Sequence, residues 1–188
     1  MDPAEKIANY QDIIDLPAHM TGEIVSGVLH AHPRPAPRHA LAASALGADI
    51  SAPYQFGRGG PGGWWILDEP EIHLGQNILV PDLAGWKKTK MPHLPETAWF
   101  ETVPDWVCEI LSPATERFDR AEKMPLYAQY GVQYCWLVDP VIQTLEAFKL
   151  IEGRWVLLST LDKQKQVSIE PFDATEFNLS DLWSEELE

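Results

Sequence analysis

The chain has 188 residues, of which 45% are hydrophobic and 22% are charged, so it can form a hydrophobic core and is not disordered throughout. Its 16 prolines exclude a simple helical bundle, because prolines interrupt long helices. The formal net charge of −14 argues against non-specific nucleic-acid binding, which depends on positive charge. The acidity is concentrated at the two ends of the chain, and residues 166–188 contain seven acidic residues and no Lys or Arg.

Cellular location is constrained by what the sequence lacks. No apolar run approaches the roughly 20 residues of a membrane span, and the first residues show neither the basic start nor the apolar stretch of a secretory signal. Cys108 and Cys135 are too few for a disulfide scaffold and suit a reducing compartment. We therefore expect a cytoplasmic protein with no membrane partner.

The first half of the chain predicts one helix followed by a hairpin. Residues 30–38 are rich in proline and are expected to be extended or turning, whereas residues 39–52 favour a helix that ends before Pro53. The glycine-rich segment 57–63 is predicted to be irregular, either as a mobile flap or as a connector. Beyond it, residues 64–67 and 71–74 are predicted to form one strand, and residues 78–86 its partner.

The second half alternates irregular segments, strands and a helix. The polar segment 87–104 predicts a loop, residues 105–111 a strand and residues 112–130 a helix. Pro125 means that this helix either begins near Arg120 or is kinked. Three further strands are predicted over residues 134–138, 144–150 and 154–161.

This order of elements predicts the α/β fold class, with a mixed α+β sheet flanked by helices. We expect residues 1–188 to form a single domain. Its parts are an N-terminal helical extension over 1–20, a core over 21–162 and an acidic C-terminal extension over 163–188.

Three side chains stand out as candidates for catalysis. Asp82 follows Pro81 at the end of an apolar strand, and Glu109 lies within a strand whose alternation places it on one face with Val107 and Leu111. A carboxylate in such surroundings needs a positive partner. Lys123 lies on the following helix, where it continues a row of basic residues at i, i+3 and i+6 with Arg117 and Arg120.

Together these residue types suit phosphodiester hydrolysis. Two carboxylates at adjacent strand ends form an oxygen site for Mg²⁺ or Mn²⁺, and a nearby lysine can orient the attacking water. Each residue also has a purely structural explanation. An Asp after Pro is typical of a turn, Glu109 can pair with Lys123 or Arg120, and the basic row can be a solvated face.

Other constellations point to packing. His30 and His32 alternate on an extended stretch but have no third ligand placed nearby by spacing, which argues against a transition-metal site. Cys108 and Cys135 lie in apolar strands and favour inert core thiols. The eight tryptophans stand mostly at strand positions, where core or subunit packing is the usual role.

Longer stretches carry a resemblance to a known family. The segments EIVSGVLHAHPRPAPRHALAASALG and PDWVCEILSPATERFDRAEKMPLYAQYGV are similar to the Uma-two type restriction endonucleases, members of the PD-(D/E)xK nuclease superfamily. The resemblance spans about residues 20–160. It implies a restriction endonuclease-like core, a Mg²⁺ or Mn²⁺ cofactor and a nucleic-acid substrate, expected to be DNA.

The resemblance also assigns roles. Pro81-Asp82 matches the PD motif and Glu109 the (D/E) position, but Leu111 stands where the motif has its lysine, and Lys123 is expected to reach that space from the helix. Asp82, Glu109 and Lys123 are thus the expected catalytic residues, and Glu23, Asp82 and Glu109 the expected metal ligands. His39 matches a family histidine that could be a neutral ligand, a substrate contact or a helix cap. The expected phosphate contacts are Arg34, Arg38, Arg117, Arg120 and Lys87–Lys90.

Two functional hypotheses follow. The first is a metal-dependent endonuclease that hydrolyses phosphodiester bonds of DNA. The second is a catalytically degenerate binding or assembly module that keeps the fold, as the charge of −14 and Leu111 in the lysine position suggest. Both favour a homodimer, because nucleases of this fold often pair and the tryptophans could supply an apolar interface.

Overall fold

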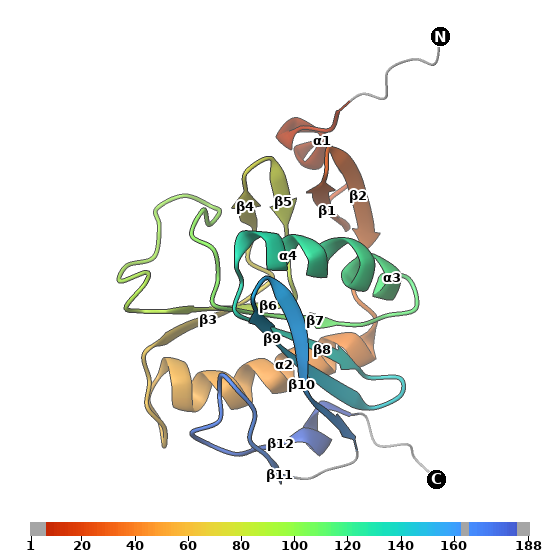
Figure 1. The fold of residues 1–188 in the computed structure, drawn as a ribbon. Helices are drawn as coiled ribbons and strands as arrows, with labels where there is room; N and C mark the ends of the chain where they lie inside the picture. The colour runs from red at the N-terminus through yellow and green to blue at the C-terminus, as the bar shows by residue number, and fades with distance from the viewer. Residues whose placement is uncertain (1–6, 163–165, 184–188) are drawn as a thin grey trace.

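A six-stranded sheet forms the centre of the computed structural model, which describes residues 7–162 and 166–183 (Figure 1). In spatial order its strands are β10 (Arg154–Asp162), β9 (Thr144–Ile151), β8 (Tyr134–Asp139), β7 (Trp106–Ile110), β6 (Leu83–Lys87) and β3 (Trp64–Asp68). Strands β7 and β8 are parallel and the other neighbours are antiparallel, so the sheet is mixed, as the sequence predicts.

Two smaller sheets accompany it. An antiparallel sheet consists, in spatial order, of β2 (Val28–Pro33), β1 (Met20–Val25), β5 (Asn77–Leu79) and β4 (Ile72–Leu74). A short ribbon pairs β11 (Gln166–Val167) with β12 (Phe177–Asn178).

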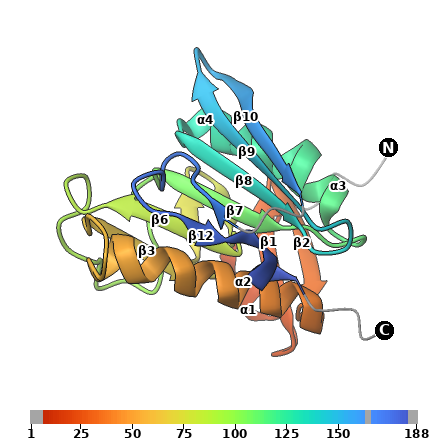
Figure 2. The same ribbon diagram turned by 90° about the horizontal axis from the view of Figure 1, so that it is seen from below.

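The helices lie on both faces of the six-stranded sheet. Helix α2 (Pro37–Ile50) covers one face and α4 (Met124–Tyr130) the other, as Figures 1 and 2 show from two directions. The remaining helical segments are α1 (Tyr10–Ile14), the π-helical turn η1 (Ser51–Gln55), α3 (Glu116–Phe118), the π-helical turn η2 (Asp119–Lys123) and the 3₁₀ turn η3 (Leu179–Leu182). Within the described ranges, no helix combines the length and the apolar character that a membrane crossing requires.

The sheet separates two hydrophobic cores. Along β7, Cys108 and Ile110 pack into the core on the α2 side, whereas Val107 packs into the core on the α4 side together with Leu111. Glu109 shares the α4 side because side chains alternate along a strand. The alternation predicted for this strand is therefore confirmed.

The strand predicted over residues 64–74 is in fact two strands in two sheets. Strand β3 pairs with β6 in the large sheet, and β4 pairs with β5 in the four-stranded sheet. Between β3 and β4, Glu69 has a φ of 43° and is followed by Pro70, so the extended chain cannot continue. The partner segment of the chain is interrupted in the same way, since Pro81-Asp82 separates β5 from β6. The two interruptions are joined by a hydrogen bond of 3.0 Å from the Glu69 amide to the Asp82 carbonyl. Asp82 thus stands where the two sheets meet.

The helix predicted over residues 112–130 is broken into three segments. Short α3 passes into the π turn η2, and α4 begins at Met124 with Pro125 in its first turn, where a proline is tolerated. The wider π turn changes the direction of the side chains. As a result Lys123 is buried while Arg117 is exposed, and the basic row expected on one side does not form.

The first long helix also differs at both ends from its prediction. It begins at Pro37, and the helical path continues through Pro53 in η1. The ring of a proline would clash with a carbonyl in a continuous α-helix. Here the Phe56 amide bonds the Ser51 carbonyl five residues back, so the turn is wider and the path continues.

Segments near both ends of the chain pack against the rest of the protein. Of the expected N-terminal extension, residues 10–14 form α1, and of the expected C-terminal extension, residues 166–183 include side chains in the core on the α2 side. These are Val167, Ile169, Phe172, Phe177, Leu179, Leu182 and Trp183. Residues 1–6, 163–165 and 184–188 lie outside the described residues.

Candidate active site

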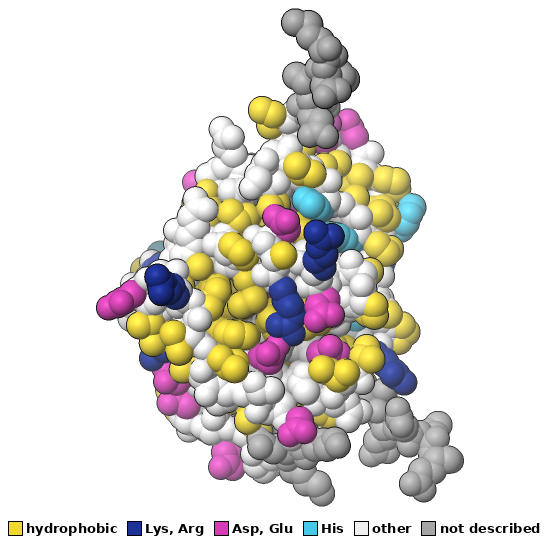
Figure 3. Space-filling view, turned by 45° about the vertical axis from the view of Figure 1, so that its right-hand side comes forward, with side chains coloured by type: hydrophobic (Ala, Val, Ile, Leu, Met, Phe, Trp, Pro, Cys, Tyr) yellow, Lys and Arg dark blue, Asp and Glu magenta, His cyan; other side chains and the backbone are white. Residues whose placement is uncertain are grey.

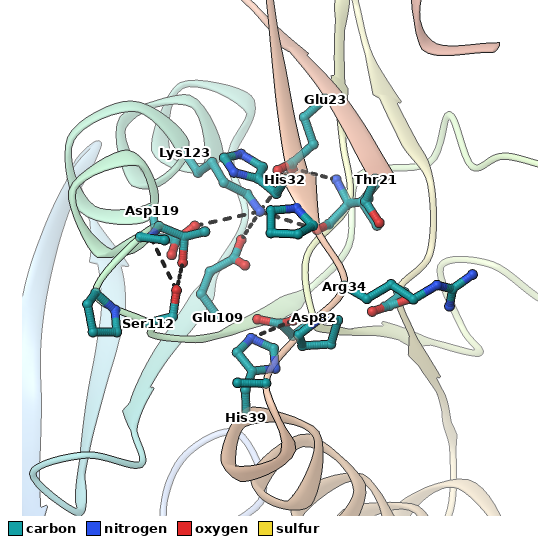
Figure 4. A pocket seen from close by; sticks show the side chains of 18 residues that line it. Thr21, Glu23, His32, Arg34, His39, Asp82, Glu109, Ser112, Asp119 and Lys123 are labelled. Atoms are coloured by element: carbon teal, nitrogen blue, oxygen red, sulfur yellow. Dashed lines mark hydrogen bonds and ion pairs between the residues drawn. The ribbon is translucent and has the colours of Figure 1, made fainter. Parts of the chain in front are cut away.

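A cavity of about 360 Å³ opens where the two larger sheets meet η2 and the start of α2 (Figure 4). Its lining includes carboxylates from five different places in the sequence, together with one buried lysine. These residues are Glu23, Glu69, Asp82, Glu109, Asp119 and Lys123. The cavity therefore gathers a strongly acidic group of side chains around a single ammonium.

Glu109 enters the cavity from β7, in the middle of the large sheet. Its side chain is only 2% exposed, and it accepts a hydrogen bond of 2.6 Å from the hydroxyl of Tyr127 on α4. Burial raises the pKa of the Glu109 carboxyl well above its ordinary value. The Lys123 ammonium opposes this shift of the pKa, while the charges of nearby carboxylates add to it.

Lys123 enters the same space from η2. Its Nζ lies 2.9 Å from an oxygen of Glu109 and 2.9 Å from an oxygen of Glu23, and it donates a hydrogen bond of 3.3 Å to the Val80 carbonyl (Figure 4). Burial alone would lower the pKa of Lys123, but the surrounding carboxylates reverse this effect and raise the pKa well above its ordinary value. Lys123 is therefore a permanent cation at neutral pH.

Glu23 comes from the other sheet. Strand β1 places its buried carboxylate beside Lys123, and the same oxygen accepts a hydrogen bond of 2.8 Å from the Val80 amide. The backbone of Val80 is thus held at its amide by Glu23 and at its carbonyl by Lys123. Because Val80 precedes Pro81-Asp82, these two contacts fix the chain that carries Asp82.

Asp82 is anchored by two partners. One oxygen accepts a hydrogen bond of 2.6 Å from the Ile110 amide, and the other lies 3.2 Å from Nε2 of His39, at the start of α2. Burial alone would lower the pKa of His39, but the hydrogen bond and charge of Asp82 outweigh burial and raise this pKa.

The comparisons with known proteins agree with this picture. The family model of Uma2, described as "Putative restriction endonuclease", matches residues 9–180. The chain belongs to the Uma2 family. No curated protein matches the sequence.

A solved structure supports the same fold. A crystal structure described as "a putative nuclease belonging to DUF820", from Anabaena variabilis ATCC 29413, is similar with a TM-score of 0.73 and 22% sequence identity. The similarity covers 93% of this chain and 97% of that chain. The family and the restriction endonuclease-like fold predicted from the sequence are therefore confirmed.

The Uma2 chain brings together most of the residues singled out in its sequence. Glu23, Asp82, Glu109, Lys123 and His39 all line the one cavity. Arg34 also lines it, as an exposed side chain at its edge.

The other basic residues lie elsewhere. Arg38 and Arg117 are exposed and stand outside the cavity lining, and the Arg120 guanidinium is engaged by Glu116 at 3.1 Å and Glu146 at 2.6 Å. Lys87 and Lys88 lie over tryptophan rings, and Lys90 is 3.5 Å from Asp105.

Besides Glu69, which lines the cavity, two residues of the site were missed by the sequence analysis. Asp119 lies 3.9 Å from the Lys123 ammonium, and Tyr127 bonds Glu109. Burial, opposed by the charge of Lys123, raises the pKa of Asp119 to about 6. Asp119 and Tyr127 each stand four positions from Lys123, which places them on its side of the helix predicted over residues 112–130, and that spacing is the signal that could have identified them.

The donor set fits a divalent cation by its chemistry. Mg²⁺ prefers oxygen ligands and is often bound by one or two carboxylates and water, and Asp82 and Glu109 are carboxylates of one cavity. The cavity also has more acidic than basic side chains, so an added cation would compensate buried negative charge. Among residues 7–162 and 166–183, no three His, Cys, Asp or Glu side chains are already grouped as metal ligands.

Proposed function

We propose that this Uma2 protein is a metal-dependent endonuclease that hydrolyses phosphodiester bonds of DNA. The observation that carries the proposal is the position of the Lys123 ammonium, 2.9 Å from Glu109 in a cavity that Asp82 also lines. Two strand-borne acids and a helix-borne lysine in one cavity are the groups that such hydrolysis requires. The family description and the name of the similar structure support the same activity.

Mg²⁺ or Mn²⁺ is the proposed cofactor, with Asp82 and Glu109 as its ligands and Glu23 as the third acid. When bound, the cation supplies positive charge that stabilises the phosphoryl oxygens in the transition state. Leu111 stands in the usual lysine position but packs in the core on the α4 side. Lys123 is therefore the proposed replacement for the lysine of the motif.

Lys123 acts in this proposal as a charged hydrogen-bond donor. Its raised pKa keeps it protonated at neutral pH, so it cannot remove a proton from water. Its three N–H donors are used by Glu23, Glu109 and the Val80 carbonyl, so it keeps Glu109 in place, and it would hold the attacking water by a charge-assisted hydrogen bond once the long bond to Val80 opens.

Substrate contacts are proposed for the side chains at the edge of the cavity. Arg34 is placed to pair with a phosphate, and Nδ1 of His39 is buried without a hydrogen-bond partner among the described residues. Arg38 and Arg117 are exposed and could contact phosphates farther along the strand.

One observation favours a second candidate function, a degenerate member that binds without cutting. Lys123 is already ion-paired with both Glu23 and Glu109 in the described structure, so of the three proposed metal ligands only Asp82 is not bound to the ammonium. A protein of this kind would keep the fold and lack metal-dependent cleavage.

Cleavage of nucleic acid separates the two candidates. Supercoiled plasmid, single-stranded DNA and RNA are incubated with the full chain and Mg²⁺ or Mn²⁺, and with EDTA as the metal-free control. Asp82→Asn and Glu109→Gln keep the size of the side chain and are expected to reduce cleavage of DNA by at least about 100-fold. Glu146→Gln is the matched control, because its carboxylate pairs with Arg120 outside the cavity.

Cleavage by the wild-type protein is measured first, and the variants are compared with it. Absence of metal-dependent cleavage of any of the three substrates would favour the binding module. Cleavage that survives in both cavity variants would place the reaction elsewhere. Cleavage of RNA alone would support a nuclease whose substrate is RNA instead of DNA.

A further inference from the structure

Asp119 is a buried acid of the cavity to which the proposed function assigns no role. Acidic side chains at the surface are hydrated by water, as the magenta side chains on one face of the molecule illustrate (Figure 3). Within the described residues, only four acidic side chains are buried, namely Glu23, Asp105, Glu109 and Asp119. The first three each have a nitrogen donor at 2.9 Å. Asp119 differs from them in how its charge is compensated.

A gap separates Asp119 from the one cation of the cavity that it faces. The Lys123 ammonium lies 3.9 Å from Oδ1 of Asp119, which is too long for a direct hydrogen bond (Figure 4). A water that hydrogen-bonds both groups at about 2.8 Å fits this separation. Asp119 would accept one of its hydrogens, and Lys123 would donate to it once the long bond to the Val80 carbonyl opens. The two residues thus form an acceptor and a donor for the same water.

We propose that Asp119 is the proton acceptor of the hydrolysis and takes a proton from the water that attacks phosphorus. This inference rests on the proposed function and supplies its catalytic base. One O–H bond of the water breaks, its proton passes to a carboxylate oxygen of Asp119, and the water oxygen uses the electron pair to bond phosphorus. The bond from phosphorus to the leaving oxygen breaks, and that oxygen keeps the electron pair and takes a proton from solvent. Asp119 then returns its proton to solvent.

The other acids of the cavity have roles that conflict with accepting a proton. Glu23, Asp82 and Glu109 are the proposed metal ligands, and a carboxylate that binds a cation must stay deprotonated. Glu23 and Glu109 also lie 2.9 Å from the Lys123 ammonium. Lys123 itself is a permanent cation, so it has no lone pair to offer.

The histidines and Glu69 complete the titratable lining of the cavity. Burial alone would lower the pKa of His39, but the contact with Asp82 outweighs it and raises this pKa, which favours the form with both ring nitrogens protonated. Glu69 is exposed. Burial lowers the pKa of His32 and makes it a weaker base, but its Nε2 has no hydrogen-bond partner among the described residues. His32 is therefore tested beside Asp119.

The surroundings of Asp119 give it suitable basicity. Burial raises the pKa of Asp119 to about 6, although the charge of Lys123 and the hydroxyl of Thr115 oppose the rise, and the charges of Asp82 and Glu23 add to it. Three further titratable groups lie within electrostatic reach, namely Glu109, His39 and Cys135. A base of this pKa is ionised at neutral pH and still accepts a proton more readily than an ordinary aspartate.

The pH profile of cleavage tests this role. Initial rates are measured on the nucleic acid that the wild type cleaves, from about pH 5 to about pH 8, for the wild type, Asp119→Asn, His32→Gln and Glu122→Gln. Glu122 is the matched control, an exposed acid of the same turn η2. The wild-type rate is expected to rise about tenfold per pH unit at acidic pH and to level off at or below about pH 6, because a bound cation favours the ionised carboxylate.

The variants are expected to separate clearly. Asp119→Asn should be at least about 100-fold slower than the wild type at pH 7 and should lack the acidic rise. His32→Gln and Glu122→Gln should both keep the acidic rise, because the proton acceptor is intact in each.

Two measurements without substrate distinguish a proton acceptor from a metal ligand and from a structural residue. Titration calorimetry should show that saturable Mn²⁺ binding persists in Asp119→Asn, whereas Asp82→Asn removes it. Urea unfolding at pH 7 should show a midpoint for Asp119→Asn at or above that of the wild type, because the amide removes a buried charge. A slow variant that is at least as stable as the wild type cannot owe its lost activity to misfolding.

Failure of this inference and failure of the proposed function give different results. A wild type that cleaves no nucleic acid would overturn the proposed function and the inference with it. If the wild type cleaves, four results would overturn the inference alone. They are an Asp119→Asn variant less than about 100-fold slower or still showing the acidic rise, loss of that rise in His32→Gln, loss of Mn²⁺ binding in Asp119→Asn, and a lower unfolding midpoint in Asp119→Asn.

Discussion

The hydroxyl of Tyr127 and the ammonium of Lys123 both contact the same oxygen of Glu109, at 2.6 and 2.9 Å. A buried carboxylate loses its hydration, and these two donors replace it. Tyr127 is thus a positioning residue in the proposed site, because it acts on Glu109 and does not itself line the cavity.

Tyr127→Phe is predicted to destabilise the protein by about 2 kcal/mol, because it removes one hydrogen bond to a buried charged group. Urea unfolding at pH 7 measures this loss. Tyr134→Phe is the matched control, since its hydroxyl bonds Glu170 at 2.9 Å near the surface, and it should cost less than about 1 kcal/mol. Metal-dependent cleavage should also fall several-fold in Tyr127→Phe alone. Equal effects of the two variants would contradict the positioning role.

The raised pKa of Asp119, about 6, predicts a pH dependence of stability. Between the ordinary pKa of an aspartate and pH 6, the folded protein keeps a proton that the unfolded chain has lost, so stability falls as the pH rises through this window. The loss amounts to about 3 kcal/mol by pH 7. Asp119→Asn removes this contribution. Urea unfolding from pH 4 to pH 7 should therefore show a smaller decline for the variant, and identical declines would refute the assignment.

At the level of single residues, sequence reasoning located the acids better than their contacts. Asp82, Glu109 and Lys123 were singled out from local pattern, and Glu23 from the family resemblance, and all four line one cavity. That Glu23 and Glu109 share one lysine depends on how two sheets approach each other, which no local pattern encodes. The roles proposed for these residues await the cleavage experiment.

The elements around the site are interrupted where the sequence predicts continuous ones. Strand pattern identified residues 64–74 as extended, but alternation is the same in one strand or in two, and only the backbone at Glu69 shows that the chain changes sheets. In the same way, helical pattern predicted residues 112–130 without the π turn that directs Lys123 inward. Both interruptions are next to the cavity, where the functional side chains depend on them.

Close packing of β6 is a property of the whole sheet and depends on Gly85. A Cβ added there would lie 3.1 Å from Ile66, 3.2 Å from Trp106 and 3.3 Å from Trp64, all of which are buried. Gly85→Ala is therefore predicted to destabilise the protein by about 1 to 3 kcal/mol. Gly47→Ala is the control within α2, where the new Cβ would meet only Leu83, at 3.4 Å, and should stabilise by up to about 1 kcal/mol. Thermal unfolding compares them, and a neutral Gly85→Ala would contradict the packing argument.

Across the whole molecule, the C-terminal segment completes the core on the α2 side. The ring of Phe172 lies within 5.6 Å, between centroids, of Tyr54, Trp64, Trp106 and Trp136. The sequence analysis assigned residues 163–188 to an acidic extension, because the charge of this segment is evident from sequence and its distant aromatic partners are not. Buried apolar residues scattered among acids give no periodic signal.

Phe172→Ala is predicted to lower the free energy of unfolding by about 3 to 5 kcal/mol, because it leaves a cavity among four aromatic rings. Phe56→Ala, at a ring that is 57% exposed, should cost less than about 1 kcal/mol. Chemical denaturation of both variants tests this. A loss for Phe172→Ala as small as that for Phe56→Ala would show that the C-terminal segment does not stabilise the core.

The central claim is that the acidic cavity binds the divalent cation of a hydrolytic site. Titration calorimetry of the full chain with Mn²⁺ tests it most directly, in the wild type, in Asp82→Asn and Glu109→Gln, and in Asp105→Asn, whose buried carboxylate lies outside the cavity. We predict saturable binding in the wild type and in Asp105→Asn and its loss in both cavity variants. Absence of binding in the wild type, or binding that persists in both cavity variants, would contradict the account.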